Sequence, residues 1–130
     1  MNENKYSENV CPVDKAMELL NKKWSIQIIR DLFFGKKHFN EFKEDKPNLS
    51  NKVLSNCLKE LEKNEIIEKR IISTSPTLTE YSLTEKGQAL NKVIYELAIF
   101  TLEKCEYDEY KSKETKRNIK NLFKNTLKIK

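Results

Sequence analysis

The stretch that decides the fold is HFNEFKEDKPNLSNKVLSNCLKELEKNEIIEKRIISTSPTLTEYSLTEKG, residues 38–87. Between residues 50 and 63 apolar side chains recur three and four positions apart, which is typical of an amphipathic helix. Between residues 66 and 83 two apolar, β-branched runs flank a Ser-Thr-Ser-Pro turn, which is typical of a β-hairpin. The stretch therefore predicts a short helix over residues 38–45, a turn over residues 47–49 and a long helix over residues 50–63. A hairpin follows, with strands over residues 66–73 and 79–83.

The long helix of this stretch has two unlike faces. Ser50 is a good N-cap for it, and its apolar stripe consists of Val53, Leu54, Cys57, Leu58 and Leu61. The opposite face consists of Ser50, Asn51, Lys52, Ser55, Asn56 and Lys59 and carries almost no acid, since Glu60 and Glu62 lie only near its far end. The DNA major groove admits one α-helix, and Asn, Lys and Ser side chains bond base edges and phosphates. The polar face of a helix is usually just solvated. A helix with such a face that follows a turn and precedes a hairpin, however, predicts a helix-turn-helix with a wing that binds double-stranded DNA.

Helical patterns flank this stretch on both sides. Apolar spacing predicts helices over residues 12–20 and 24–34, and Gly35 is placed to end the second one. After the hairpin, Thr84 is placed to cap a long final helix over residues 84–110. The expected fold class is mainly α with a small β-hairpin, a winged helix-turn-helix in one domain over residues 11–110.

Composition limits the class of protein. The chain of 130 residues has room for one modest core, and it contains no apolar run that could span a membrane. Residues 1–10 are polar, so we expect a disordered arm, no secretory signal and a cytoplasmic protein. The net charge of +5 is concentrated in the tail. Residues 111–130 hold eight basic residues and one acid, whereas residues 1–110 hold 17 basic residues and 19 acids. The overall basic character is therefore no argument that residues 38–87 bind DNA.

The chain offers little material for a metal site or for catalysis. Its only histidine is His38, and its three cysteines, Cys11, Cys57 and Cys105, are far apart in sequence without a CxxC pair. A structural zinc ion needs about four ligands, which would take all of these residues. A glycine-rich phosphate loop is also absent from the sequence. We therefore expect no metal, no cofactor and no enzymatic activity, and a reducing compartment with free thiols.

Several short motifs, each weak alone, occur in one unbroken order. They are Cys11-Pro12-Val13, Lys23-Trp24, Phe39-Asn40-Glu41-Phe42, Leu49-Ser50-Asn51-Lys52-Val53-Leu54, Leu58-Lys59-Glu60-Leu61-Glu62 and Glu80-Tyr81-Ser82-Leu83-Thr84-Glu85-Lys86-Gly87. Over residues 11–105 the series resembles the HxlR family, a branch of MarR-like winged-helix transcription regulators in bacteria. The resemblance implies a homodimer that binds a pseudo-palindromic operator as a repressor or an activator, with residues 84–110 and the N-terminal helix at the dimer interface. Apolar residues on two faces of the segment 90–102 also indicate that a partner covers them.

The resemblance assigns roles to two of the cysteines. In this family a cysteine at the place of Cys11 is often a sensor of oxidants or electrophiles, and in some members it pairs with a cysteine on the partner's last helix. Cys105 lies in the corresponding helix of this chain. A thiol near a helix N-terminus has a stabilised thiolate, which agrees with reactivity at Cys11. The alternative is that both are ordinary thiols, and Cys57, on the apolar stripe, is expected in the core.

The predicted wing departs from the family pattern. A basic residue is common just before the Glu-Tyr pair, whereas this chain has Thr77-Leu78-Thr79 there. Lys69 and Arg70 on the first strand are therefore the candidate phosphate contacts. For His38 the sequence leaves three roles open, namely a phosphate contact, a cap of the short helix, or an inert surface residue. The basic tail over residues 111–130 has amphipathic helical spacing, and it adds DNA affinity, packs on the dimer or is solvated.

Two other classes of function are consistent with parts of the sequence. A winged-helix protein-interaction module would show no salt-dependent DNA affinity. A thiol-based enzyme would need a resolving cysteine or a base near Cys11, and the sequence places neither there.

Overall fold

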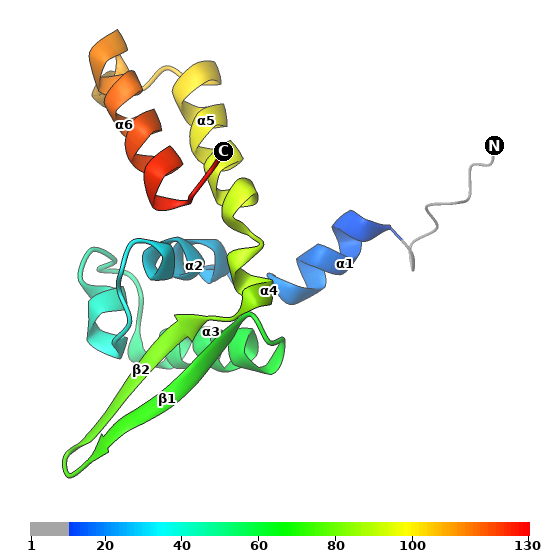
Figure 1. Cartoon of the computed structure of the whole chain (residues 1–130), viewed down its shortest axis with the longest axis vertical. Helices are drawn as coiled ribbons and strands as arrows, with labels where there is room; N and C mark the ends of the chain where they lie inside the picture. Colours follow the sequence, from blue (N-terminus) through cyan, green and yellow to red (C-terminus); the bar gives the residue numbers. More distant parts are fainter. Residues whose placement is uncertain (1–10) are drawn as a thin grey trace.

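The computed structural model describes residues 11–130, so the arm expected over residues 1–10 lies outside the described residues. The elements follow the order of a winged helix-turn-helix (Figure 1). They are α1 (Pro12–Leu19), α2 (Ser25–Phe33), the 3₁₀ helix η2 (Phe39–Lys43), α3 (Asn51–Lys63), β1 (Ile67–Thr74), β2 (Thr77–Leu83), α4 (Glu85–Gln88), α5 (Asn91–Lys104), the 3₁₀ helix η3 (Asp108–Tyr110) and α6 (Lys113–Thr126). The expected fold class is thus confirmed. None of the described helices is long and apolar enough to cross a membrane.

The core lies where α2, η2, α3 and the base of the hairpin meet. The stripe predicted on α3 is buried at four of its five positions, and α2, η2 and β1 add the side chains that face it. Val53 is the exception, with 44% of its surface exposed. It lies about a quarter turn around α3 from the centre of the stripe, because successive residues are about 100° apart. The fully buried apolar members of the core are Ile28, Ile29, Phe42, Leu54, Cys57, Leu58, Leu61, Ile66, Ile67 and Leu127.

Gly35 ends α2 in the way its position predicts. Its φ of 101° lies in the left-handed region, which glycine adopts without steric cost. The amide of Gly35 donates to the carbonyl of Leu32 (3.2 Å), and the amide of Lys36 donates to that of Asp31 (3.0 Å). These two bonds form a Schellman motif, so α2 stops abruptly and the chain turns toward η2.

The hairpin is longer than predicted, and only its base is buried. β1 and β2 pair antiparallel from Ile67 opposite Leu83 to Thr74 opposite Thr77, with an irregularity between Ile71 and Ser73. The turn is therefore tighter than the five residues that the sequence indicated. Ile71, Ile72 and Leu78 are exposed, because the outer half of the hairpin extends beyond the core as a wing (Figure 1).

The final helix is not continuous, contrary to prediction. Thr84 does cap a helix, since its Oγ1 accepts a hydrogen bond from the amide of Gly87 (3.0 Å), but that helix is the single turn α4. A Cβ on Gly87 would lie 2.2 Å from the carbonyl oxygen of Ile66, so α4 is held close against the end of α3 and β1. The chain leaves helical geometry at Leu90 (ψ 4°) and starts α5 in a new direction. α5 ends at Lys104, so Cys105, which was expected within the last helix, lies just after it in extended backbone.

The basic tail forms a helix that packs on the rest of the chain. α6 lies beside α5 (Figure 1), and Leu127, directly after α6, is 1% exposed and belongs to the core. The ring of Phe123 meets that of Phe34 edge-to-face, with centroids 5.0 Å apart. Asn91 donates from Nδ2 to the carbonyl of Leu127 (2.9 Å). The tail therefore joins α5 to the end of α2, whereas α1 projects from the body and buries none of its side chains.

Candidate nucleic-acid interface

The polar face of α3 is presented to solvent. We use the name recognition face for Ser50, Asn51, Lys52, Ser55, Asn56 and Lys59. All six are exposed except Ser55, which is half-buried. From Asn51 to Lys59 they span about 140° of the helix surface, on the side opposite the buried stripe. No acid occurs between residues 50 and 59, so this face presents only hydrogen-bonding groups and positive charge.

The first turn of α3 is fixed by its cap. The Oγ of Ser50 accepts a hydrogen bond from the amide of Val53 (3.1 Å), as predicted for an N-cap. The hydroxyl hydrogen of Ser50 is then available to a phosphate oxygen. The positive end of the helix dipole lies at the same place and favours an anion.

Lys43 is a neighbour of the recognition face that the sequence did not reveal. Its Nζ donates to Oδ1 of Asn51 across eight residues and two elements. A cation therefore lies beside the start of α3, and the amide hydrogens of Asn51 remain free to donate. The sequence carried one signal for this lysine, namely its place directly after Phe42, which packs inward from η2.

His38 links the helix-turn-helix to the wing. Its Nδ1 lies 3.0 Å from the carbonyl oxygen of Thr79 on β2. The amide of Tyr81, also on β2, donates to the carbonyl of Lys37 (2.8 Å). This second bond also holds β2 against the segment that precedes η2. The Oε1 of Glu41 accepts from the amides of Lys37 and His38, both at 2.9 Å, and these bonds lower the pKa of the Glu41 carboxyl. Of the roles expected for His38, a local structural one has direct contacts in the structure.

The two basic residues of the wing lie on opposite faces of the hairpin. Lys69 pairs with Tyr81, which is buried, and Arg70 pairs with Glu80. Successive side chains of a strand point to opposite sides, so one phosphate group cannot be contacted by both residues in the same way. Glu80 also lies 3.8 Å from Nζ of Lys37, so the positive charge near Arg70 is partly balanced by an acid.

The three cysteines differ in environment. Cys57 is buried with its Sγ 3.9 Å from Oγ of Ser25, and burial raises the pKa of its thiol, as expected for a core residue. Cys11 and Cys105 are half-buried free thiols. Cys11 precedes α1 and Cys105 follows α5, and these two helix ends are well separated within one chain (Figure 1).

Apolar side chains remain exposed on α1 and α5. Val93, Leu97 and Phe100 follow one another at intervals of four and three residues, so they form one stripe along α5. Val13 and Met17 form a similar pair on α1. Within the described chain, α6 and α2 pack on α5 but leave this stripe uncovered.

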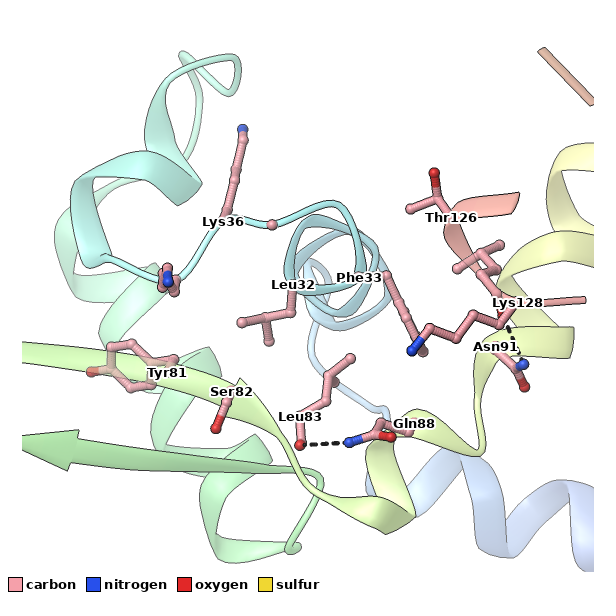
Figure 2. A pocket seen from close by; sticks show the side chains of 13 residues that line it. Leu32, Phe33, Lys36, Tyr81, Ser82, Leu83, Gln88, Asn91, Thr126 and Lys128 are labelled. Atoms are coloured by element: carbon pink, nitrogen blue, oxygen red, sulfur yellow. Dashed lines mark hydrogen bonds between the residues drawn. The ribbon is translucent and has the colours of Figure 1, made fainter. Parts of the chain in front are cut away.

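A depression lies on another side of the molecule, between the wing and the tail (Figure 2). It has a volume of about 480 Å³ and is lined by the end of α2, by β2, and by the ends of α4 and α6. Lys128 extends across it toward Phe33 in Figure 2. None of its lining residues belongs to the recognition face.

In residues 11–130 there is also no cluster of three or more side chains suited to hold a metal ion.

A helix-turn-helix whose second helix exposes a face without acids over residues 50–59, with a hairpin beside it, defines a winged-helix protein. The family described as HxlR-like helix-turn-helix matches residues 19–109, and the chain belongs to this family. The predicted resemblance is confirmed, and α6 lies beyond the matched segment.

Relatives and solved structures agree on this class. The HTH-type transcriptional regulator YodB of Bacillus subtilis (strain 168) is 42% identical over 98 residues, which cover 75% of this chain and 88% of YodB. The structure of the reduced form of YodB matches with a TM-score of 0.62 over 74% of this chain and 95% of that one, at 42% identity. The redox regulator HypR in its oxidized form matches with a TM-score of 0.68 over 75% of this chain and 100% of that one, at 29% identity. The chain is therefore a transcription regulator of the HxlR type, within the MarR-like winged helices.

Proposed function

We propose that this regulator represses transcription by binding a pseudo-palindromic operator as a homodimer, with the recognition face in the major groove. The observation that carries the proposal is the recognition face itself, an exposed surface without acids on the second helix of the motif. Asn51 and Asn56 have the groups that discriminate base edges, and Lys52 and Lys59 match phosphates or guanine. Lys69, Arg70 and His38 are secondary candidates for backbone contacts.

The exposed apolar stripe supports the dimer. Phe100 on α5 is 61% exposed, and covering such a stripe with the same stripe of a second copy yields a two-fold, isologous interface. Val13 and Met17 on α1 extend the apolar surface. The two recognition faces would then read half-sites about one turn of DNA apart, or a multiple of it.

Cys11 and Cys105 are the candidates for a response to oxidants or electrophiles. HypR, which this chain resembles in fold, is a redox regulator. In the proposed reaction a two-electron oxidant such as diamide accepts two electrons and two protons from the thiols of Cys11 on one chain and Cys105 on its partner, and an S–S bond forms. The separation of the two positions within one chain favours a bond between chains.

DNA binding is tested by selecting a duplex from a random pool with the full chain and measuring its affinity at several salt concentrations. The variants Lys52→Ala and Asn56→Ala should each weaken binding to the selected duplex, by about tenfold or more where a base contact is lost. Lys113→Ala, on α6, removes the same charge away from the recognition face and is the matched control. A chain without salt-dependent affinity for DNA would instead be a winged-helix module for protein contact.

The redox response is tested on a non-reducing gel after treatment with diamide. Wild type should form a covalent dimer with altered operator affinity, and Cys11→Ser and Cys105→Ser should not. Cys57→Ser is the control, since the raised pKa of this buried thiol disfavours its reactive thiolate. A wild-type protein that forms no dimer band and keeps its affinity would rule out this part of the proposal.

A further inference from the structure

A lysine is buried in the turn that precedes α3. Lys46 lies in the turn between η2 and α3 and is only 5% exposed, and Asp31, near the end of α2, is 3% exposed. Lysine and aspartate are almost never fully buried unless they are paired. The Nζ of Lys46 donates to Oδ2 of Asp31, to the carbonyl of Phe42 (2.9 Å) and to Oδ1 of Asp45 (3.1 Å). All three donors of the ammonium group are therefore used.

Asp31 is held just as firmly from its own side. Its Oδ1 accepts from Nε and Nη2 of Arg30, at 3.1 and 2.9 Å. Its backbone carbonyl accepts from Lys36, in the motif that ends α2. The Nζ of Lys36 lies 3.9 Å from Oδ2 of Asp31 and 3.3 Å from Asp45. The carboxylate thus has one preferred position, fixed by the end of α2.

Lys46 is also close in the chain to the start of α3. Its carbonyl accepts from the amide of Leu49 (3.0 Å), Leu49 is buried, and Ser50 follows as the N-cap. A displacement of Lys46 would therefore be passed to the first turn of α3, where the recognition face begins. At its other side α2 packs against α5, which carries the apolar stripe proposed for the dimer.

We propose that Lys46 and Asp31 are a positioning pair, which holds the recognition face of α3 at a fixed place relative to α2 and α5. The inference rests on the proposed function, since it concerns how accurately the two recognition faces of a dimer meet the DNA. Charge-assisted hydrogen bonds are directional, whereas apolar contacts are not. Base contacts need donors and acceptors within a few tenths of an ångström, and contacts to phosphates tolerate larger displacements.

The double variant Asp31→Leu/Lys46→Met tests the pair. Replacing a buried ion pair by apolar residues of similar size is often neutral or stabilising, so the variant should keep its melting temperature or raise it. We expect its affinity for the selected duplex to fall by about tenfold or more, as for a lost base contact, while its affinity for a scrambled duplex of equal length and its salt dependence stay the same. The exposed pair of Asp108 and Lys111 (3.2 Å) provides the control Asp108→Leu/Lys111→Met, with the same change of charge.

The outcomes separate three cases. A double variant with an unchanged ratio of specific to non-specific affinity overturns the positioning role, and so does a variant in which only the melting temperature changes. A wild-type chain that prefers no duplex overturns the proposed function, and with it this inference. If circular dichroism shows that the double variant is unfolded, Asp31→Asn, which keeps the shape of the side chain and removes its charge, takes its place with the same expected loss of the ratio.

Discussion

The imidazole of His38 and the backbone of Thr79 are in direct contact, with Nδ1 3.0 Å from the carbonyl oxygen. Because a carbonyl only accepts, Nδ1 carries the hydrogen, and Nε2 is left on the other side of the ring. This side chain at the start of the helix-turn-helix, together with the backbone bond from Tyr81 to Lys37, holds β2 and with it the base of the wing.

We expect His38→Ala to destabilise the fold by about 0.5–1.5 kcal/mol, the usual contribution of one hydrogen bond. Operator affinity should fall because the wing is less fixed, with the slope of its salt dependence unchanged. Urea denaturation and DNA titrations at several salt concentrations measure the two effects. Asn40→Ala, on the exposed side of η2, is the control. A slope lowered by about one, with unchanged stability, would mean that His38 contacts a phosphate.

Arg70→Ala should weaken binding to all DNA sequences alike and lower the salt slope by about one, as the loss of one phosphate contact does. Lys69→Ala removes the same charge from the opposite face of the hairpin and is the matched comparison. If the slope changes for Lys69→Ala and not for Arg70→Ala, the other face of the wing meets the DNA. If neither changes, the wing makes no phosphate contact through these residues.

Asp45 links stability to pH. The hydrogen bond from Lys46 lowers the pKa of the Asp45 carboxyl from 3.8 to about 2, and a bond from Lys36 adds to it. Because the folded state binds the proton less readily than the unfolded chain, this contribution to stability is present above about pH 4 and is lost as the pH falls toward 2. Asp45→Asn should lower stability near neutral pH and flatten its decrease in that acid range.

Urea denaturation at a series of pH values measures this effect of Asp45. The neighbouring exposed residue provides the control Glu44→Gln. A variant Asp45→Asn whose stability decreases in acid as steeply as that of wild type would show that the ion pairs of Asp45 do not contribute.

The tail should contribute to global stability through Leu127. This side chain is 1% exposed. Leu127→Ala should therefore lower the free energy of unfolding by about 2–5 kcal/mol, as is usual for a buried leucine. Leu78→Ala, at the exposed end of the wing, makes the same chemical change and should stay within about 0.5 kcal/mol of wild type. Equal midpoints of thermal or urea unfolding for the two variants would mean that α6 is not part of the cooperative fold.

The parts of the fold that depend on neighbours in sequence were predictable. The caps Ser50 and Thr84 and the end of α2 at Gly35 each rely on groups within five residues, and the structure confirms all three. The buried stripe of α3 follows from its helical period. The break between α4 and α5 was missed because apolar spacing continues across it. Gly87 in α4 lies against the backbone of Ile66, 21 residues away, and a glycine inside a helical pattern was the only local signal.

The site was predictable in outline and not in its connections. The composition of the recognition face follows from the period of α3. The bond of Lys43 to Asn51, the bond of Lys46 to Asp31 and the contact of His38 with the wing join residues that are brought together only by folding. In sequence, Lys46 resembles any exposed lysine of a polar turn. None of its neighbours in sequence indicates that its side chain contacts Asp31 in the folded chain.

The close approach of Gly87 to Ile66 also has a consequence for sequence variation. A side chain at position 87 would have to displace backbone, and not merely the end of a flexible side chain. In a library of random variants selected for a working protein, position 87 should therefore keep its glycine, whereas the exposed positions on either side, Lys86 and Gln88, should accept many amino acids. One invariant position between two variable ones would then mark, in sequence data alone, the point where the winged helix-turn-helix is joined to the segment of α5 and α6.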